Sequence, residues 1–228
     1  MNLNNLEEKL NLKFKNKSLL REAITHRSYL NEHQHEKLNS NERLEFLGDA
    51  VLEFAVSKIL FERFVGESEG FLTACRSQVV QTKTLSYLAT NLDLGSFLLL
   101  SKGEEEGGGR KNQALLENAF EALIGAIFLD LGIQEATEFV SEHFLPLIEN
   151  LNLEDLKDAK SLLQEKTQDK EKITPSYRVL GEIGPDHAKT FTVGVYLGKN
   201  RIATGQGRSK QEAEEEAART ALEKSYQS

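Results

Sequence analysis

The chain has 228 residues, of which 39% are hydrophobic and 28% charged, a composition typical of a globular protein with one large or two small domains. No stretch approaches the ~20 apolar residues that a membrane-spanning helix needs, and the N-terminus lacks a secretory signal pattern, so we expect no membrane association. The single cysteine, Cys75, excludes an internal disulfide and fits a reducing compartment, so we expect a cytoplasmic protein.

The charge is unevenly distributed along the chain. The net charge of −8 argues at first against a nucleic-acid partner. Residues 157–228, however, contain 13 Lys and Arg against 11 Asp and Glu, a net charge of +2, which leaves −10 for the rest of the chain. This asymmetry suggests two modules, of which the first could concentrate cations and the second could approach a polyanion.

The first part of the chain is predicted to be helical. From residue 3 to about 148 the apolar residues recur at intervals of three and four, which is typical of amphipathic helices. The strongest patterns cover residues 6–14, 18–30, 41–64, 72–90 and 114–132. Residues 101–113 contain four glycines among polar residues and predict a loop. We therefore expect an all-α domain over residues 1–150, followed by a polar linker at 151–157.

The period changes after the linker. Residues 158–170 have helical spacing, whereas residues 176–184, 190–199 and 201–208 alternate apolar with polar side chains, as strands do. Residues 209–225 form a last helix with alanines at helical spacing. An α-β-β-β-α order predicts a small α+β domain over residues 158–228, with an antiparallel sheet covered by helices on one face.

Three carboxylates share one face of the predicted helix at residues 41–64. At about 100° per residue, Glu42, Glu45 and Asp49 cluster opposite the apolar stripe, and Gly48 would permit close approach of another helix. Such clustering costs a few tenths of a kcal/mol per pair. It indicates either a solvated acidic face or a bound cation. The stripe that we expect to be buried consists of Leu44, Leu47, Val51, Phe54 and Ala55.

A second helix favours the cation. In residues 114–132, Asn118 and Glu121 are three positions apart and are surrounded by small residues that allow helices to pack closely. If the two helices meet, Glu45, Asp49, Asn118 and Glu121 would supply an all-oxygen set suited to Mg²⁺. We expect no organic cofactor and no side-chain nucleophile. The histidines form no pattern with Ser or Cys, and His26 is expected to be structural.

Several motifs resemble those of the ribonuclease III family. The string "NERLEFLGDAVL" resembles the family signature, and "ITHRSYL", "EGFLTACRSQVV" and "ENAFEALIGAIFLD" resemble further segments of its nuclease domain. The C-terminal module is similar to a double-stranded RNA-binding domain, with "GPDHAKTF" as its first hairpin and "GQGRSKQEA" as its entry into the last helix. The resemblance covers nearly the whole chain.

The resemblance implies a homodimeric, Mg²⁺-dependent endonuclease that cuts both strands of double-stranded RNA. The products would carry 5′-phosphate and 3′-hydroxyl ends, and the family implies roles in ribosomal and messenger RNA processing. By motif position, Glu45, Asp49 and Glu121 would be metal ligands, and Asp49 would lie beside the reacting phosphate. Glu42 and Glu69 would be supporting acidic residues. Phe46 would insert into the partner subunit.

Asn118 is a departure from the family pattern, which usually has Asp at this position. An amide oxygen can still coordinate Mg²⁺, but one negative charge is lost, so we predict weaker metal affinity with cleavage retained. The alternative is a catalytically weak, double-stranded RNA-binding regulator. A third class, an acidic helical protein with a scaffold module, would have to treat both sets of motifs as accidents.

The C-terminal module offers candidate RNA contacts. Double-stranded RNA exposes 2′-hydroxyls in its minor groove and phosphates along its major groove. The candidates are Gln164 and Glu165 for 2′-hydroxyls, His187 for the second minor groove, and Arg208, Ser209 and Lys210 for phosphates at the start of the last helix.

Other charged residues are weaker candidates. We expect Glu214, Glu215 and Glu216 to form a solvated outer face, and few cations to contact phosphate, so that RNA affinity is modest with a shallow salt dependence. Arg76 and Arg110 in the first module are candidate phosphate contacts, and each could equally be a surface arginine.

Overall fold

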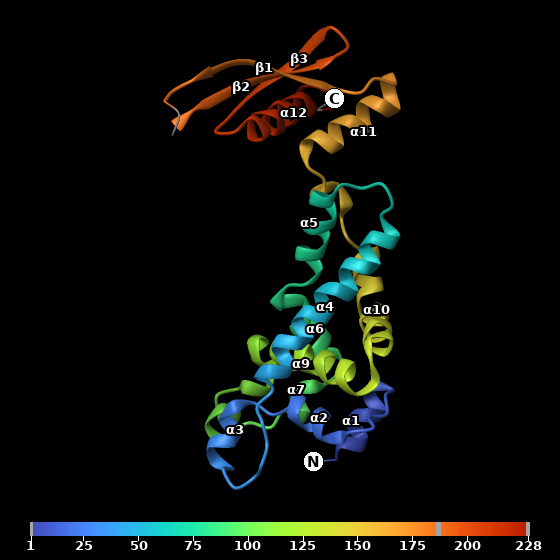
Figure 1. The fold of residues 1–228 in the computed structure, drawn as a ribbon, viewed down its shortest axis with the longest axis vertical. Helices are drawn as coiled ribbons and strands as arrows, with labels where there is room; N and C mark the ends of the chain where they lie inside the picture. Colours follow the sequence, from blue (N-terminus) through green and yellow to red (C-terminus); the bar gives the residue numbers. More distant parts are fainter. Residues whose placement is uncertain (1, 186–187, 227–228) are drawn as a thin grey trace. The chain divides into compact units, whose positions relative to one another are not determined.

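The chain forms two compact units in the computed structural model, which describes residues 2–185 and 188–226 (Figure 1). The helical domain is Met1–Leu151, and the C-terminal domain is Asn152–Ser228. The division falls at the start of the segment that we expect to be a linker. The all-α and α+β classes expected from the sequence are both confirmed. No helix in the described ranges is long and apolar enough to cross a membrane.

The helical domain consists of ten α-helices and one 3₁₀ helix in its described residues. They are α1 (Leu3–Leu10), α2 (Lys17–Ala23), α3 (Arg27–Glu32), α4 (Glu42–Arg63), α5 (Glu69–Val79), α6 (Thr82–Asn91), α7 (Leu94–Phe97), α8 (Lys102–Glu106), η1 (Gly109–Lys111), α9 (Gln113–Leu131) and α10 (Ile133–Glu149).

The core of this domain is built around α9, which packs against α2, α4, α6 and α10 (Figure 1). Between Leu116 and Ile127 every residue of α9 is buried except Glu117, Asn118 and Glu121, which are half-buried. A helix that is apolar on nearly all sides belongs in an interior. Its three polar residues therefore mark the one place in this stretch where α9 reaches solvent.

The pattern at residues 18–30 does not form one helix. It divides into α2 and α3 because the backbone between them pairs with a distant segment. The Leu99 amide donates to the Ile24 carbonyl at 2.8 Å, and the His26 amide donates to the Leu99 carbonyl at 3.1 Å. His26 then caps α3, since its ring nitrogen accepts from the Ser28 amide. His26 is thus structural, as expected.

The glycine-rich segment at residues 101–113 is more ordered than we expected. Its first part forms α8, capped by the Ser101 hydroxyl, and η1 follows. Gly109 is buried, and a Cβ atom there would lie 2.7 Å from the Glu104 carbonyl oxygen. The prediction of a loop without packed elements is therefore wrong for much of this segment, because the glycines allow close packing.

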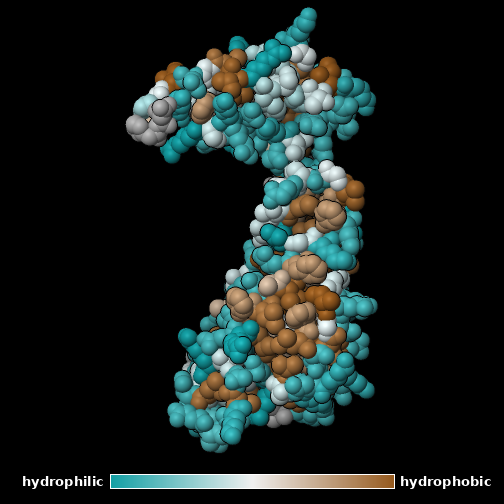
Figure 2. Space-filling model, in the orientation of Figure 1, coloured by the Kyte–Doolittle hydropathy of each residue, from teal (hydrophilic) through white to brown (hydrophobic). Residues whose placement is uncertain are grey.

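The apolar stripe predicted on α4 needs two corrections, of which the smaller is that Leu47 is only half-buried. Phe54 was assigned to the buried face, but 53% of it is exposed. Together with Phe46 and Phe61, which are 81% and 72% exposed, it forms an apolar stripe on the outward side of α4. Figure 2 shows apolar side chains gathered along this part of the helical domain. An exposed patch of this kind is typical of an interaction surface.

The C-terminal domain contains η2 (Leu153–Leu156), α11 (Ala159–Glu171), β1 (Ser176–Ile183), β2 (Thr190–Leu197), β3 (Asn200–Gly207) and α12 (Lys210–Tyr226). The strands form an antiparallel sheet in the order β1-β2-β3. Alanines of α12 and Leu163 of α11 pack on Val195 and Ala203. A Cβ atom at Gly205 would lie 2.1 Å from the Ala217 amide nitrogen, so glycine lets α12 rest directly on β3.

Candidate functional site

Helices α4 and α9 cross with their backbones in contact. A Cβ atom at Gly48 would lie 1.8 Å from the Glu121 carbonyl oxygen, and one at Gly125 would lie 2.3 Å from the Leu44 carbonyl oxygen. Only glycine fits at both positions. The close approach expected at Gly48 is therefore present, and it brings the polar residues of α9 next to the acidic face of α4.

The carboxylates of the two helices act on one another electrostatically. Burial raises the pKa of Glu121 to about 8, and the negative charges of Asp49, Glu117 and Glu45 contribute further. Burial also raises the pKa of Glu45, with contributions from Glu42, Glu117 and Asp49. The neighbouring negative charges disfavour the ionised forms of Glu45 and Glu121. The crossing is thus a concentrated acidic site.

The carboxylates of this acidic site are not balanced by cationic side chains in the described part of the chain. Within the described residues, Glu45, Asp49, Glu117 and Glu121 form no ion pair with Lys or Arg and no side-chain hydrogen bond. No three Asp, Glu, His or Cys side chains in the same residues lie close enough together to hold a metal ion as they stand. Of the predicted ligands, Glu45, Asp49 and Glu121 are near enough for their charges to act on one another, but their side chains are not drawn together around a point.

Glu42 and Glu69 differ in their relation to this site. Glu42 is one turn before Glu45, accepts a hydrogen bond from the Ser40 hydroxyl at 2.8 Å, and lies 3.6 Å from the Arg27 guanidinium. Glu69 begins α5 and accepts from the Thr73 hydroxyl at 3.3 Å. It lines a hollow with Phe54 and Phe61 and is not among the charges that act on Glu45 or Glu121.

Glu117 was missed by the sequence reasoning. It is one helical turn before Glu121 and half-buried, and its charge acts on both Glu45 and Glu121. Its spacing of four residues from Glu121 was the available signal, because residues four apart share a helix face. Glu117 adds a negative charge next to Asn118, the position at which the family usually has a negatively charged Asp.

The candidate RNA-binding residues of the C-terminal domain are mostly exposed. Gln164 and Glu165 lie on the solvent side of α11, and Glu165 is paired with Lys157. The Ser209 hydroxyl accepts from the Glu212 amide at 3.1 Å and so caps α12. Arg208 and Lys210, on either side of Ser209, are exposed at the start of that helix. His187 lies outside the described residues.

The two arginine candidates of the helical domain have structural partners. The Arg110 guanidinium donates to the carbonyl oxygens of Gly95, Ser96 and Leu98 and pairs with Glu105. Arg76 donates to the Ser57 hydroxyl at 2.8 Å. These contacts give Arg110 in particular a structural role, which neither alternative anticipated, because its guanidinium is already surrounded by acceptors.

Comparison with known proteins identifies both domains. Residues 16–148 match a family model described as ribonuclease-III-like, and residues 159–225 match the double-stranded RNA binding motif. Ribonuclease 3 of Borreliella burgdorferi is 48% identical over 216 residues, which cover 94% of this chain and 88% of the relative. Ribonuclease 3 of Carboxydothermus hydrogenoformans is also 48% identical, over 97% of this chain and 95% of the relative.

A solved structure supports the same assignment for the helical domain. The nuclease domain of ribonuclease III from Campylobacter jejuni is 42% identical and has a TM-score of 0.57, covering 65% of this chain and 94% of that one. A second structure of that domain, 40% identical with a TM-score of 0.57 over 63% of this chain and 99% of that one, is described as flexible in a region involved in dimer formation. The expected resemblance is confirmed, and the chain belongs to the ribonuclease III family, whose members are endoribonucleases specific for double-stranded RNA.

Proposed function

We propose that the protein uses Mg²⁺ to hydrolyse phosphodiester bonds in both strands of double-stranded RNA, leaving 5′-phosphate and 3′-hydroxyl ends. The observation that carries the proposal is the contact between α4 and α9, which brings together half-buried carboxylates that form no ion pair with any other described residue. Processing of ribosomal and messenger RNA precursors in the cytoplasm is the corresponding role. The single free, buried Cys75 is compatible with a reducing compartment.

The donor chemistry of the site fits a hard divalent cation. Carboxylate and amide oxygens are the ligands that Mg²⁺ prefers, and Mg²⁺ needs only one or two carboxylates because it retains several waters. Glu45, Asp49, Asn118 and Glu121 are the proposed ligands. When bound, the ion would supply an activated water and neutralise charge on the phosphate.

The residues around the ion would have distinct tasks. Glu121 is half-buried at the crossing, so it would fix the ion from the protein side. Asp49 is exposed and would face the scissile phosphate. At neutral pH the raised pKa of Glu121 keeps a proton on its carboxyl group, and this proton must leave before the oxygen can bind a cation.

A second copy of the chain would complete the site. The exposed Phe46 is next to Glu45 on α4, and the hollow lined by Phe54, Phe61 and Glu69 measures about 430 Å³. If the partner's Phe46 enters this hollow, Glu69 would lie beside the acidic site of the partner. Within its own chain, Glu69 is not among the charges that act on Glu45 or Glu121. Isologous pairing of this kind repeats the contact twice. It would give two cutting sites for two RNA strands.

The proposed dimer is tested by Phe46→Asp, which places a charge in the apolar hollow. We expect dimers of the wild-type protein and monomers of the variant by sedimentation velocity, with unchanged circular dichroism. The control is Tyr87→Asp, which changes an aromatic residue on α6 that is 55% exposed and lies outside this hollow. Phe97→Asp would be less suitable because Phe97 is partly buried. Persistent dimers of Phe46→Asp would refute the assignment.

The alternative function is an RNA-binding regulator with little catalysis, and Asn118 is the observation that favours it. One assay separates the two. Labelled duplex RNA is incubated with the full chain in Mg²⁺ or in EDTA, with single-stranded RNA of the same sequence as control. Cutting of the duplex only with Mg²⁺ supports the nuclease. Binding of the duplex without cutting in Mg²⁺ would support the regulator.

A further inference from the structure

The glutamates of α12 do not form the solvated face that we expected. The Glu215 carboxylate accepts a hydrogen bond from the Ala159 amide of α11 at 2.5 Å. The Glu214 carboxylate pairs with the Lys160 ammonium at 2.6 Å, and both side chains are largely shielded from solvent. Only Glu216 behaves as expected, because it pairs with the exposed Arg219 of its own helix. Two of the three acidic side chains therefore hold α11.

These contacts converge on the first turn of α11. The Asp158 carboxylate caps the helix by accepting from the Ser161 amide, and Glu215 takes the amide of Ala159. Free amides of a first helical turn need such acceptors. The Lys160 ammonium also lies 5.0 Å from the centre of the Tyr177 ring on β1, a cation–π distance. We call Lys160, Tyr177, Glu214 and Glu215 the α11 clamp.

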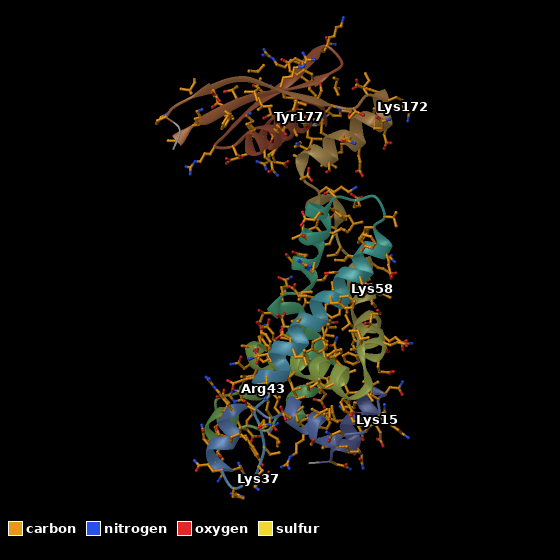
Figure 3. The ribbon with its side chains drawn as sticks, viewed as in Figure 1. Lys15, Lys37, Arg43, Lys58, Lys172 and Tyr177 are labelled. Atoms are coloured by element: carbon orange, nitrogen blue, oxygen red, sulfur yellow. The ribbon has the colours of Figure 1, made fainter. Side chains whose placement is uncertain are left out.

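Tyr177 contributes to the clamp from strand β1, where Figure 3 labels it. Its hydroxyl is buried and has no hydrogen-bond partner in the described part of the chain. Burial and the charges of Glu215, Glu214 and Asp158 raise its pKa far above the ordinary value, so the hydroxyl stays neutral. An unpaired buried hydroxyl costs stability. The Tyr177 ring nevertheless lies beside the Lys160 ammonium.

The apolar contacts of α11 are few. Only Leu163 and Thr167 are buried along its thirteen residues. A helix with so narrow a buried face depends on other contacts to fix its rotation and position. Gln164 lies one turn after Lys160, and Glu165 follows it, so any shift of the first turn moves both side chains.

Resting on the function proposed above, we propose that Glu214 and Glu215 are positioning residues for RNA recognition: through the α11 clamp they hold α11 so that Gln164 and Glu165 reach the 2′-hydroxyls of the minor groove. Acidic residues near a polyanion would otherwise weaken binding by repulsion. Their contacts with Lys160 and the Ala159 amide explain how they serve binding instead.

The test exploits the sign of the charge change. Binding of the full chain to a labelled duplex longer than about 16 base pairs is measured in EDTA by fluorescence anisotropy. Neutralising a glutamate should strengthen RNA binding if only repulsion matters. We expect Glu215→Gln and Glu214→Gln to weaken binding by roughly threefold to tenfold. Glu216→Gln, the matched control on the same helix, should leave affinity unchanged or slightly increased.

The salt dependence and a charge exchange provide further readouts. Because the clamp touches no phosphate, the slope of affinity against salt should be the same for Glu215→Gln and wild type. Lys160→Glu should weaken binding by roughly tenfold, and Lys160→Glu with Glu214→Lys should recover most of it. This exchange tests the proposal even if a single Gln variant fails to fold.

The outcomes separate the two proposals. If wild type binds the duplex and Glu214→Gln, Glu215→Gln and Glu216→Gln all bind equally well or more tightly, the clamp proposal is overturned. Failure of the charge exchange to recover affinity would also overturn it. If the wild-type chain does not bind duplex RNA at all, the proposed function fails first.

Discussion

The contact at Gly48 makes a strong prediction about Gly48→Ala. An added Cβ atom would lie 1.8 Å from the Glu121 carbonyl oxygen, 2.6 Å from its carbonyl carbon and 2.9 Å from the Gly125 nitrogen. Ordinary contact begins at 3.4 Å, so α4 and α9 would have to separate by about 1.6 Å, the difference between 3.4 and 1.8. All three obstacles are backbone atoms, which cannot rotate away.

The expected cost follows from this separation. Overpacking in a core costs about 1–3 kcal/mol, and a backbone clash of this depth should be at the upper end, about 3 kcal/mol. The gain from replacing glycine in a helix is only about 1 kcal/mol. A misplacement of about 1 Å can lower a rate about 100-fold. Gly48→Ala should therefore be less stable by about 2 kcal/mol and nearly inactive.

The assay combines unfolding and cleavage. Urea unfolding is followed by far-UV circular dichroism, and cleavage is measured on duplex RNA with Mg²⁺ under conditions in which the variant is folded. Gly70→Ala on α5 is the matched control, because the nearest atom to its new Cβ, the Ser68 hydroxyl, is 3.9 Å away. It should be as stable as wild type or slightly more so, with unchanged cleavage. If Gly48→Ala were as stable and as active as the wild-type protein, the packing argument would be refuted.

Two further predictions concern the carboxylates. Because the pKa of Glu121 is raised from 4.5 to about 8, the folded state retains a proton that the unfolded chain has lost, so stability in EDTA should fall as pH rises from about 5 to 8. Allowing for solvent screening of this half-exposed group, urea unfolding should show wild type losing roughly 1 kcal/mol more than Glu121→Gln between pH 6 and 8.5; equal losses would count against the raised pKa. Asn118→Asp should lower, and Glu117→Gln raise, the Mg²⁺ concentration for half-maximal cleavage, each by roughly threefold to tenfold. Glu138→Gln on α10 is the charge-matched control, and unchanged values for the first two variants would show that local charge does not set metal affinity.

Much of the fold could be predicted from local pattern. The helical spacing of apolar residues and the alternation in the strands depend on periods of 3.6 and 2, and the role of Gly48 followed from its lack of a side chain. The break at Ile24–His26 could not be predicted, because it results from pairing with Leu99, more than 70 residues away.

The site was predicted in part. The acidic face of α4 followed from spacing, which permitted a meeting with α9 without fixing it, whereas the importance of Glu117 depends on where α9 is buried. Phe54 has an apolar side chain that fits the buried stripe, but about half of it is exposed. Glu214 and Glu215 looked like surface charges because their partners, Lys160 and the Ala159 amide, are more than 50 residues away. Such partners are set by tertiary packing and leave no local signal.

The most direct test of the account is Mn²⁺ binding to the full chain without RNA, measured by electron paramagnetic resonance. Mn²⁺ favours the same oxygen ligands as Mg²⁺. If one ion is held by both helices, Glu45→Gln on α4 and Glu121→Gln on α9 should each weaken binding strongly, and the double variant should be little worse than either. Glu138→Gln should bind as wild type does. Binding that is unaffected by either substitution, or lowered independently by each, would contradict a single site between α4 and α9.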